Sequence, residues 1–384
     1  MKSVANLNAA EEGKFMSILQ ANLETTVQDP SVLIDKITKI FEEHAQITTE
    51  SAVTKISLPY GSADLFAEQE KFCVNVTSED DAGLAYMKYA IAYQLTETLK
   101  EENSDAKIVW SGDGAAGTVL AFLREMQVVS NTEVTPLMRR VRLRGENLER
   151  FTRDGLHVRL LFPKHKNVKP EWPVMGESGI PVWPEGEKEL VGRAYTIRHI
   201  DVDAGIVDID LVLHECDEDS AHDGGYGARW AVEAKAGDIV GMTGPGGGSA
   251  PLTADWYLLA GDETALPAIG RILENLPAGS KATVRIEIAD KAEEQVLNTK
   301  AELDLRWLHR NGIKGDKNQL LYDAVREIDY PDHEENIFVW VGCEFSAFRS
   351  IRSFVRKEKK IPREKHLVVA YWRQGTSGDA ARRE

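Results

Sequence analysis

From about Asp255 onward the sequence alternates short buried strands with helical stretches, and this pattern constrains the fold more than any other feature. The predicted strands are 257–260, 283–288, 337–341 and 366–371. Such alternation is typical of a parallel sheet with helices on both faces. We therefore expect residues 251–384 to form an α/β nucleotide-binding domain.

The preceding part of the chain has a different pattern, in which short alternating strands are separated by turns. The predicted strands are 139–144, 157–162, 193–200, 206–213 and 238–243. This spacing predicts a six-stranded antiparallel Greek-key β-barrel over residues 124–250. Residues 163–192 form a Pro- and Gly-rich excursion, too long for an ordinary hairpin, which we interpret as a functional loop.

A change in composition marks the first domain boundary. Arg124 is the first arginine of the 384-residue chain, a length that favours two or three domains. Residues 1–112 are predicted to form a small α+β domain, with helices capped by Ser31 and Ser78. Its histidine, His44, is interpreted as solvated. Ser111–Gly117 is glycine-rich and is predicted to be a flexible linker, and Val119–Met126 a short connecting helix.

Composition also narrows the class of protein. The chain has no apolar run of about 18 residues and no signal-peptide pattern, so we expect no membrane insertion. Cys73, Cys216 and Cys343 lie far apart, which argues against a metal site or disulfide framework and favours a cytoplasmic protein. The net charge of −16 argues against nucleic acid as a partner.

Gly192–Arg198 opens one of the predicted barrel strands and offers three groups that suit a flavin. Arg193 supplies a cation for a pyrophosphate, Tyr195 a ring that stacks on the isoalloxazine, and Thr196 a hydroxyl for its reactive edge. We expect all three to project from one face of the strand. A solvated barrel strand is the alternative interpretation of the same residues.

Two further segments suit phosphate groups. Gly224–Ala231 places glycines before a short helix, where backbone N–H groups bind anions. The chain has no GxGxxG, so Gly261, Asp262, Glu263 and Thr264, between a buried strand and a helix, are the predicted phosphate turn of the second domain.

Taken in order, these segments resemble the siderophore-interacting proteins, the ferric-siderophore reductase branch of the ferredoxin-reductase-like flavoenzymes. The resemblance extends from about Arg124 to Gly375. The N-terminal part resembles a short domain of unknown function that is sometimes fused ahead of such proteins. The resemblance implies FAD and NAD(P)H as cofactors and a ferric siderophore as substrate.

The resemblance also implies roles for individual residues. The implied cofactor-binding residues are Arg193, Tyr195, Thr196 (near flavin N5), His214, Gly227, Ala228, Trp230, Gly261, Asp262, Glu263, Thr264 and Glu344. No protein side chain is expected to be catalytic in its own right. The family usually has serine where this chain has Ala228, which removes a hydroxyl donor. Cys343 is a second departure, interpreted as a small buried hydrophobe.

The substrate-binding residues are predicted from their charge, because ferric catecholates are strongly anionic and would be attracted by cationic side chains. The candidate cations are Lys164, Lys166, Arg229 and Arg373, with His165 and Lys169 nearby. A solvated loop explains the lysines equally well. In the implied reaction NAD(P)H reduces the flavin, electrons pass singly to ferric iron, and the more weakly bound Fe(II) is released.

Two alternatives to a ferric-siderophore reductase stay open at this point. One is a flavin oxidoreductase of the same architecture with another acceptor, and the other is a non-enzymatic siderophore-binding protein. The choice between NADH and NADPH is also open. Lys291 would meet a 2′-phosphate, whereas the neighbouring Asp290 favours a free ribose hydroxyl.

Overall fold

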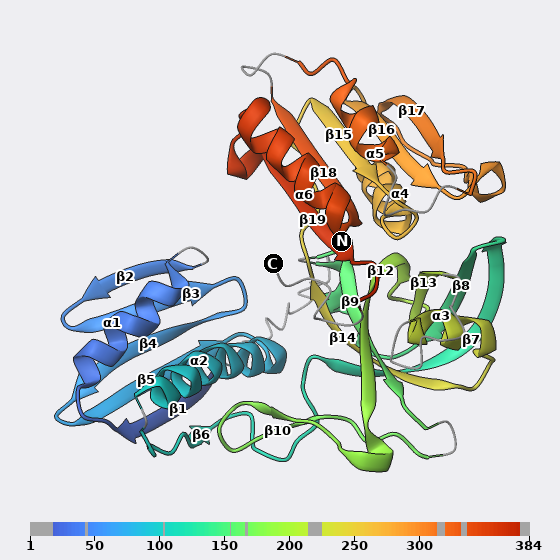
Figure 1. Cartoon of the computed structure of the whole chain (residues 1–384). Coiled ribbons are helices and arrows are strands. Elements are labelled where there is room, and N and C mark those ends of the chain that lie inside the picture. Colours follow the sequence, from blue (N-terminus) through green and yellow to red (C-terminus); the bar gives the residue numbers. More distant parts are fainter. Residues whose placement is uncertain are drawn as a thin grey trace, which may run out of the picture. The chain divides into compact units, whose positions relative to one another are not determined.

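The computed structural model describes residues 18–42, 45–102, 104–153, 155–165, 168–213, 225–312, 319–331 and 336–376. The chain divides into two compact units (Figure 1). The first comprises Met1–Phe122 together with Glu171–Glu185, and the second Leu123–Pro170 together with Gly186–Glu384. Residues 171–185, which lie within the predicted barrel domain in sequence, therefore belong to the first unit.

The first unit is an antiparallel sheet with two helices. Its six strands lie in the order β2-β3-β4-β5-β1-β6. Their bounds are β1 Leu19–Thr26, β2 Gln46–Glu50, β3 Val53–Leu58, β4 Gly61–Glu68, β5 Lys71–Ser78 and β6 Trp110–Gly112, with helices α1 Pro30–Phe41 and α2 Asp81–Glu101. The helices are capped by Asp29 and Asp80, whose carboxylates accept from Val32 N and Gly83 N, so the predicted Ser31 and Ser78 caps are wrong.

The predicted linker is part of this unit's structure. Strand β6 pairs with β1. Asp113 and Gln20 exchange two bonds: Asp113 N donates to Gln20 O at 2.7 Å, and Gln20 N to Asp113 Oδ2 at 2.9 Å. The buried Lys88 Nζ donates to Gly114 O at 2.7 Å. The prediction of a flexible linker is therefore wrong, because backbone groups of this stretch are held by the sheet and by α2.

Part of the long excursion also folds onto the first unit. Gly117 N donates to Met175 O at 2.7 Å, and Met175 N donates to Thr118 O at 2.9 Å. Trp110 Nε1 donates to Ser178 O at 2.9 Å. The short strands β10 (Val174–Met175) and β11 (Pro181–Val182) pair with each other, and Val119 bridges Val174. The stretch 119–126 consists of this bridge, a turn and the start of strand β7 (Leu123–Thr135), so the connecting helix predicted there is wrong.

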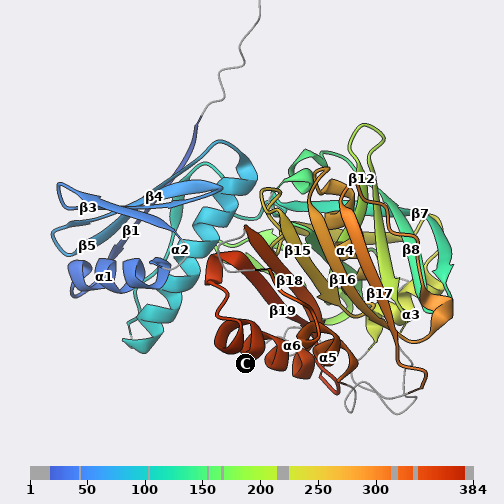
Figure 2. The same cartoon turned by 90° about the horizontal axis from the view of Figure 1, so that it is seen from above.

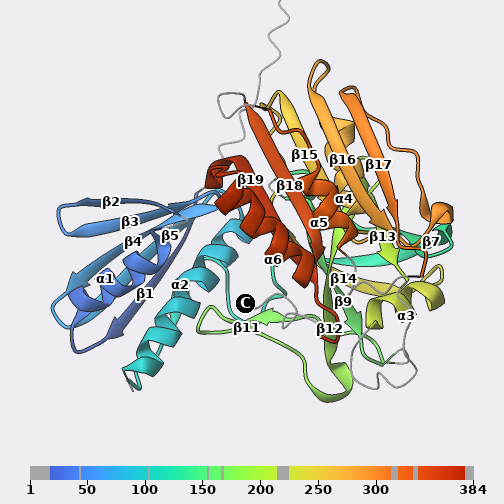
Figure 3. The same ribbon diagram turned by 45° about the horizontal axis from the view of Figure 1, so that its top comes forward.

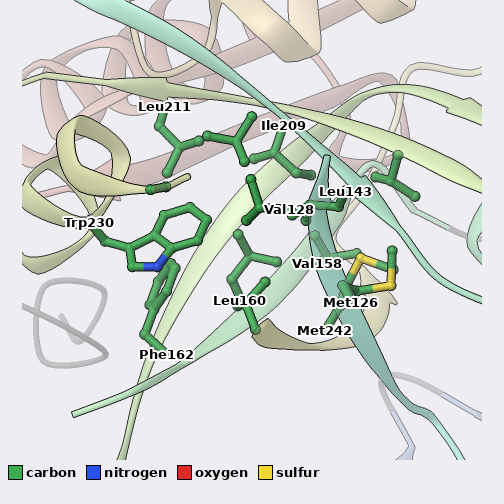
Figure 4. Close-up of a cluster of buried hydrophobic side chains, with 14 of the residues drawn as sticks. Met126, Val128, Leu143, Val158, Leu160, Phe162, Ile209, Leu211, Trp230 and Met242 are labelled. Carbon is green, nitrogen blue, oxygen red and sulfur yellow. The ribbon is translucent and has the colours of Figure 1, made fainter. Parts of the chain in front are cut away.

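The second unit contains a closed antiparallel barrel in the order β12-β13-β8-β7-β14-β9. The strands are β7 Leu123–Thr135, β8 Met138–Arg144, β9 His157–Pro163, β12 Leu190–Asp201, β13 Ile206–Val212 and β14 Ile239–Gly246, with η1 Glu149–Thr152, η2 Gly186–Lys188 and the helix α3 Tyr226–Glu233. Alternate residues fill the interior, with Trp230 and Phe162 at one end and Met126 and Met242 at the other (Figure 4). The predicted barrel is confirmed, and β7 is its sixth strand.

The rest of the second unit is a five-stranded parallel sheet in the order β17-β16-β15-β18-β19 (Figure 2). The strands are β15 Trp256–Gly261, β16 Lys281–Ile288, β17 Glu302–His309, β18 Ile337–Glu344 and β19 His366–Trp372. The helices are α4 Leu266–Asn275, α5 Leu320–Arg326 and α6 Phe345–Ser353, with short turns η3 Lys291–Glu293, η5 Phe354–Glu358 and η6 Arg363–Lys365.

This sheet is covered on both faces, as expected. In β15, Tyr257 and Leu259 pack in the cluster that contains α4, whereas Leu258 and Ala260 pack in the cluster that contains α5 and α6. Helix α6 lies along β18 and β19 (Figure 3). Strand β17 was not predicted, because it is an edge strand with alternating exposed and half-buried residues rather than a fully apolar run.

Barrel and sheet contact each other through specific polar groups. Glu293 is buried and accepts from Thr135 Oγ1 at 2.5 Å and Leu137 N at 3.0 Å, at the turn between β7 and β8. Arg198 on β12 forms a bidentate pair with Glu274 on α4, at 3.0 and 2.6 Å. The Arg198–Glu274 pair joins β12, the strand with the predicted flavin residues, to α4 of the nucleotide-binding domain.

Candidate functional site

The predicted flavin residues of β12 lie on two faces of the strand. Tyr195 packs against the barrel core, on the side of Ile197, and Arg193 is two residues before it. Thr196 directly follows Tyr195, and consecutive side chains of a strand point to opposite faces. The expectation of one shared face is therefore wrong for Thr196, which is buried on the other side.

Tyr195 joins β12 to the start of α3. Its hydroxyl lies against the backbone of Gly227, where an added methyl group would overlap it. The Tyr195 ring meets Phe162 edge-on, with centroids 6.3 Å apart, and burial raises the pKa of its phenol. Two predicted segments about thirty residues apart in sequence thus meet in space, and only glycine at position 227 permits the contact.

The first turn of α3 has the form that suits a phosphate. Its N-cap, Gly225, adopts the left-handed conformation with φ 76°, and no side chain caps the helix. At the other end, Asn131 Nδ2 donates to Ala231 O at 2.7 Å and Ala234 O at 2.9 Å. The start of α3 therefore fits a flavin pyrophosphate bound by backbone N–H groups.

Other residues of this segment have different positions from those expected. Trp230 is buried in the barrel core, with its ring centroid 4.8 Å from that of Phe162, and Ala228 is buried as well. Both side chains pack in the protein, so any contact they make with a phosphate comes from their backbone. His214, Lys166, His44 and Cys216 lie outside the described residues.

In the second domain, the predicted residues meet at the carboxyl edge of the sheet. Asp262 is buried, and its carboxylate accepts from Thr264 N and Oγ1, Glu344 N and Trp372 Nε1, at 2.9, 2.5, 2.9 and 2.8 Å. These bonds join the ends of β15, β18 and β19. Gly261 allows the turn, because a Cβ there would press on Gly342 O. Glu344 caps α6 by accepting from Ser346 N.

Three carboxylates and one guanidinium share the interior of this edge. Arg310 forms a bidentate pair with Glu263 and lies 3.4 Å from Glu287 Oε1. Burial, with Glu263 nearby, raises the pKa of Asp262 to about 6. Burial likewise raises the pKa of Glu287 to about 7, although Arg310 opposes the shift. The side chains of the turn are thus engaged with each other, and the N–H groups of Thr264, Ala265 and Leu266 also donate within the turn. No side chain caps the start of α4, so the helix dipole is the feature of this turn that suits a phosphate.

His157 and Tyr371 form a bridge that the sequence did not indicate. His157 on β9 is the register partner of Thr196, and its Nε2 lies 2.6 Å from Tyr371 Oη at the end of β19. The rings meet edge-on at 87°. Thr196 is therefore next to a contact between the barrel and the parallel sheet.

The predicted substrate cations are on separate elements. Lys164 pairs with Glu189 at 2.9 Å on the surface. Arg229 is exposed on α3, one turn from Tyr226, whose hydroxyl donates to Pro163 O at 2.8 Å. The start of α3 is thereby brought next to the Lys164 segment. Arg373 follows β19, with its guanidinium 4.5 Å from the centre of the Phe345 ring.

The structure also describes three other features that the sequence analysis considered. Cys343 is buried in the core, and burial raises the pKa of its thiol, which confirms a small hydrophobe. Asp290 Oδ1 accepts from Ala292 N at 2.8 Å as the cap of η3, while Lys291 is exposed. Among the residues with described positions there is no group of three or more metal-ligating side chains, and no helix long and apolar enough to cross a membrane.

Comparisons with known proteins agree with this geometry. Residues 127–249 match the siderophore-interacting FAD-binding domain, and residues 254–375 match the siderophore-interacting protein model. The ferric vibriobactin reductase ViuB of Vibrio cholerae is 32% identical over 273 residues, which cover 69% of this chain and 93% of that protein. The NADPH-dependent ferric-chelate reductase of Escherichia coli is 28% identical over 260 residues, or 65% and 92% of the two chains.

A solved structure shows the same architecture. The siderophore utilization protein from T. fusca is 34% identical in sequence and superposes with a TM-score of 0.54. The match covers 68% of this chain and 97% of that one. With both domain models matched in order on the barrel and the parallel sheet, the chain belongs to the siderophore-interacting protein family.

Proposed function

We propose that this protein is an FAD-dependent ferric-siderophore reductase that takes its electrons from NAD(P)H. The observation that carries the proposal is the meeting of Tyr195 on β12 with the glycine-led start of α3, within the matched FAD-binding domain. Arg193 is on the same strand, two residues before Tyr195. Relatives that align over most of their length are named as ferric vibriobactin reductase and as ferric-chelate reductase.

The chain's own residues bind and orient the cofactor. Arg193 pairs with the pyrophosphate, the α3 backbone at Gly227 and Ala228 binds its oxygens, and Tyr195 supports the isoalloxazine. Thr196 would lie near the flavin, and it is the register partner of His157, which is bridged to Tyr371 of the nucleotide-binding domain. When bound, FAD supplies the redox chemistry, accepting electrons in pairs from nicotinamide and passing them singly to ferric iron.

The nicotinamide nucleotide binds at the carboxyl edge of the parallel sheet. The turn Gly261–Thr264 and the start of α4 hold its phosphates, while Asp262 fixes the turn to Glu344 and Trp372. This role for Asp262 is positioning, because its carboxylate is buried and bonded within the protein.

Anionic ferric chelates are attracted by Arg229 and Arg373, with Lys164 on the segment that adjoins the start of α3. Exposed charges of this kind are screened beyond about 8 Å at physiological ionic strength, so the attraction depends on salt. The double variant Arg229→Gln/Arg373→Gln is expected to raise KM for a ferric catecholate while NAD(P)H oxidation with a neutral acceptor is unchanged. The matched control is Lys235→Gln/Lys281→Gln, which removes two exposed cations elsewhere. Equal KM values for both variants would refute this assignment.

One experiment separates the three candidate functions. The purified protein is reduced with NAD(P)H under anaerobic conditions, and flavin absorbance near 450 nm is followed after addition of a ferric siderophore. Rapid reoxidation, with Fe(II) trapped by a chelator, is expected for a reductase. Reduction without reoxidation would indicate a flavin oxidoreductase with another acceptor, and protein without flavin would indicate a binding protein. A cytoplasmic location is part of the proposal, supported by the free, buried Cys73 and Cys343.

A further inference from the structure

The last helix of the nucleotide-binding domain and the turns after it are strongly basic, on a chain that is otherwise acidic. Between Arg349 and Lys365 there are eight lysines and arginines and two glutamates, hence a net charge of +6. Since the whole chain carries −16, the remainder carries −22. We call this segment, residues 349–365, the basic segment.

The cations of the basic segment share a surface. Arg349, Arg352 and Arg356 recur at spacings of three and four residues, which places them on one side of the helix. Arg349, Arg356, Lys357, Lys360 and Arg363 are exposed, and the other three cations are half-buried. The opposite side of α6 packs on β18 and β19 (Figure 3). The charges are thus presented outward from a rigid support.

Several of these cations are fixed in place by aromatic rings. Lys359 Nζ lies 4.4 Å from the centre of the Tyr330 ring, and the Arg352 guanidinium 5.3 Å from that of Phe348. Arg356 Nε donates to His366 Nε2 at 3.1 Å. The neighbouring α5 contributes Asp323 and Glu327, and Glu327 pairs with Arg306 at 3.0 Å. Asp329, beside Tyr330, is a further exposed acidic neighbour. When these three acidic residues are set against the net charge of +6 on the basic segment, the described residues of this face still carry +3.

The basic segment presents charge without an apolar anchor. Its larger apolar side chains, Ile351, Phe354, Val355 and Ile361, are all buried. Specific protein interfaces centre on buried aromatic or aliphatic anchors that fit a pocket of the partner. A surface of many mobile anions requires only a matching array of cations, and clusters of four to eight lysines and arginines bind anionic lipid headgroups in this way.

We propose that the basic segment docks this protein on an anionic membrane surface, by electrostatic attraction and without insertion. The net charge of −22 on the rest of the chain does not prevent this docking, because charges more than about 8 Å away are screened at physiological ionic strength. The docking goes beyond the reductase activity and does not depend on it. It would place the enzyme beside the membrane from which an imported substrate emerges.

The test measures sedimentation of the full-length protein with two kinds of vesicle, phosphatidylcholine alone and phosphatidylcholine mixed with phosphatidylglycerol. The variant is Arg349→Gln/Lys357→Gln/Lys360→Gln, three exposed positions away from the cofactor residues. The control, Arg153→Gln/Lys235→Gln/Lys281→Gln, has the same composition and net charge and also changes exposed residues of the second unit. Unchanged flavin content and circular dichroism show that both variants fold.

Binding of the parent protein is expected only to the anionic vesicles, weakening as salt rises. Because each cation near an anionic surface contributes about a fivefold factor, the loss of three should weaken binding by the variant about a hundredfold, whereas the control should bind like the parent. Equal binding to both vesicles, or equal loss in both variants, would overturn the proposal. Binding to soluble polyaspartate or duplex DNA in preference to vesicles would also overturn it, in favour of an acidic protein or a nucleic acid.

Discussion

The contact between Tyr195 and Gly227 gives the most direct test of the flavin site. Gly227→Ala places a methyl group where the Tyr195 hydroxyl lies. Tyr195 is held by Phe162 and the barrel core and cannot move aside freely. Overpacking costs about 1–3 kcal/mol, and the severe overlap with the Tyr195 hydroxyl places this case in the upper part of that range, at about 2–3 kcal/mol. Alanine gains about 1 kcal/mol over glycine as a helix former. We expect a net loss of about 1–2 kcal/mol in the free energy of unfolding.

The assay combines thermal unfolding with equilibrium binding of FAD to the apoprotein. A loss of 1–2 kcal/mol corresponds to a Tm lower by about 2–8 °C for a unit of this size. If the displaced Tyr195 also disturbs the cofactor, Kd for FAD rises about five- to thirtyfold. The matched control is Gly270→Ala in α4, where the added carbon meets its nearest neighbour at 3.5 Å, an ordinary contact.

A second variant makes the test specific. In Tyr195→Phe/Gly227→Ala the clashing oxygen is removed, and the nearest ring atom is then 2.9 Å from the new carbon. Part of the lost stability should return, relative to Tyr195→Phe alone. The reasoning would be refuted if Gly227→Ala behaved like Gly270→Ala, or if removing the hydroxyl restored nothing.

Three further predictions follow from other contacts. Arg193→Ala is expected to weaken FAD binding about ten- to a hundredfold, because a charge-assisted bond contributes about 1.5–3 kcal/mol. The control is Arg198→Ala, which is on the same strand but paired with Glu274 and should keep its flavin. Equal flavin occupancy in both variants after dialysis would contradict the assignment. The pKa of Glu287 is about 7 when folded against 4.5 in its ordinary state, so the native protein binds the extra proton and its stability falls as pH rises from about 4.5 to 7. At pH 8, Glu287→Gln should therefore unfold at a higher temperature than the parent, with a free energy of unfolding that is larger by at most about 3 kcal/mol. Near pH 4.5 the variant and the parent should unfold at the same temperature. A constant difference between them across this range would show that Glu287 does not titrate. Finally, a chain beginning at Leu123 lacks Trp110, Gly117 and Thr118, the hydrogen-bond partners of residues 175–178. A protease should therefore cut this shorter chain within residues 171–185 much faster than it cuts the full chain. Equal cleavage rates would show that these hydrogen bonds do not order the segment.

Local pattern was sufficient for much of this protein. The interior strands of the parallel sheet and five of the six barrel strands are visible in the sequence because each is a short apolar or alternating run bounded by turns. The ordered motifs from Gly192 to Gly375 carried the family resemblance. Arg193, Tyr195 and Gly227 are predicted flavin residues because their residue types suit a flavin wherever their strand and helix lie.

The tertiary structure decided what depends on contacts between distant segments. Nothing near residue 175 in sequence indicates that this part of the excursion pairs with residues 117–118 of the first unit, and glycines at 112–117 suggest a linker until their hydrogen-bond partners are known. Asp262 has the sequence environment of a phosphate turn, yet its bonds to Glu344 and Trp372 span 82 and 110 residues. Thr196 faces His157 and Tyr371 rather than Tyr195's side of the strand, because alternation of side chains and barrel closure together set its neighbours. Residue type and spacing determine which groups are present, but the partners that fix each group's orientation and charge come from the folded chain.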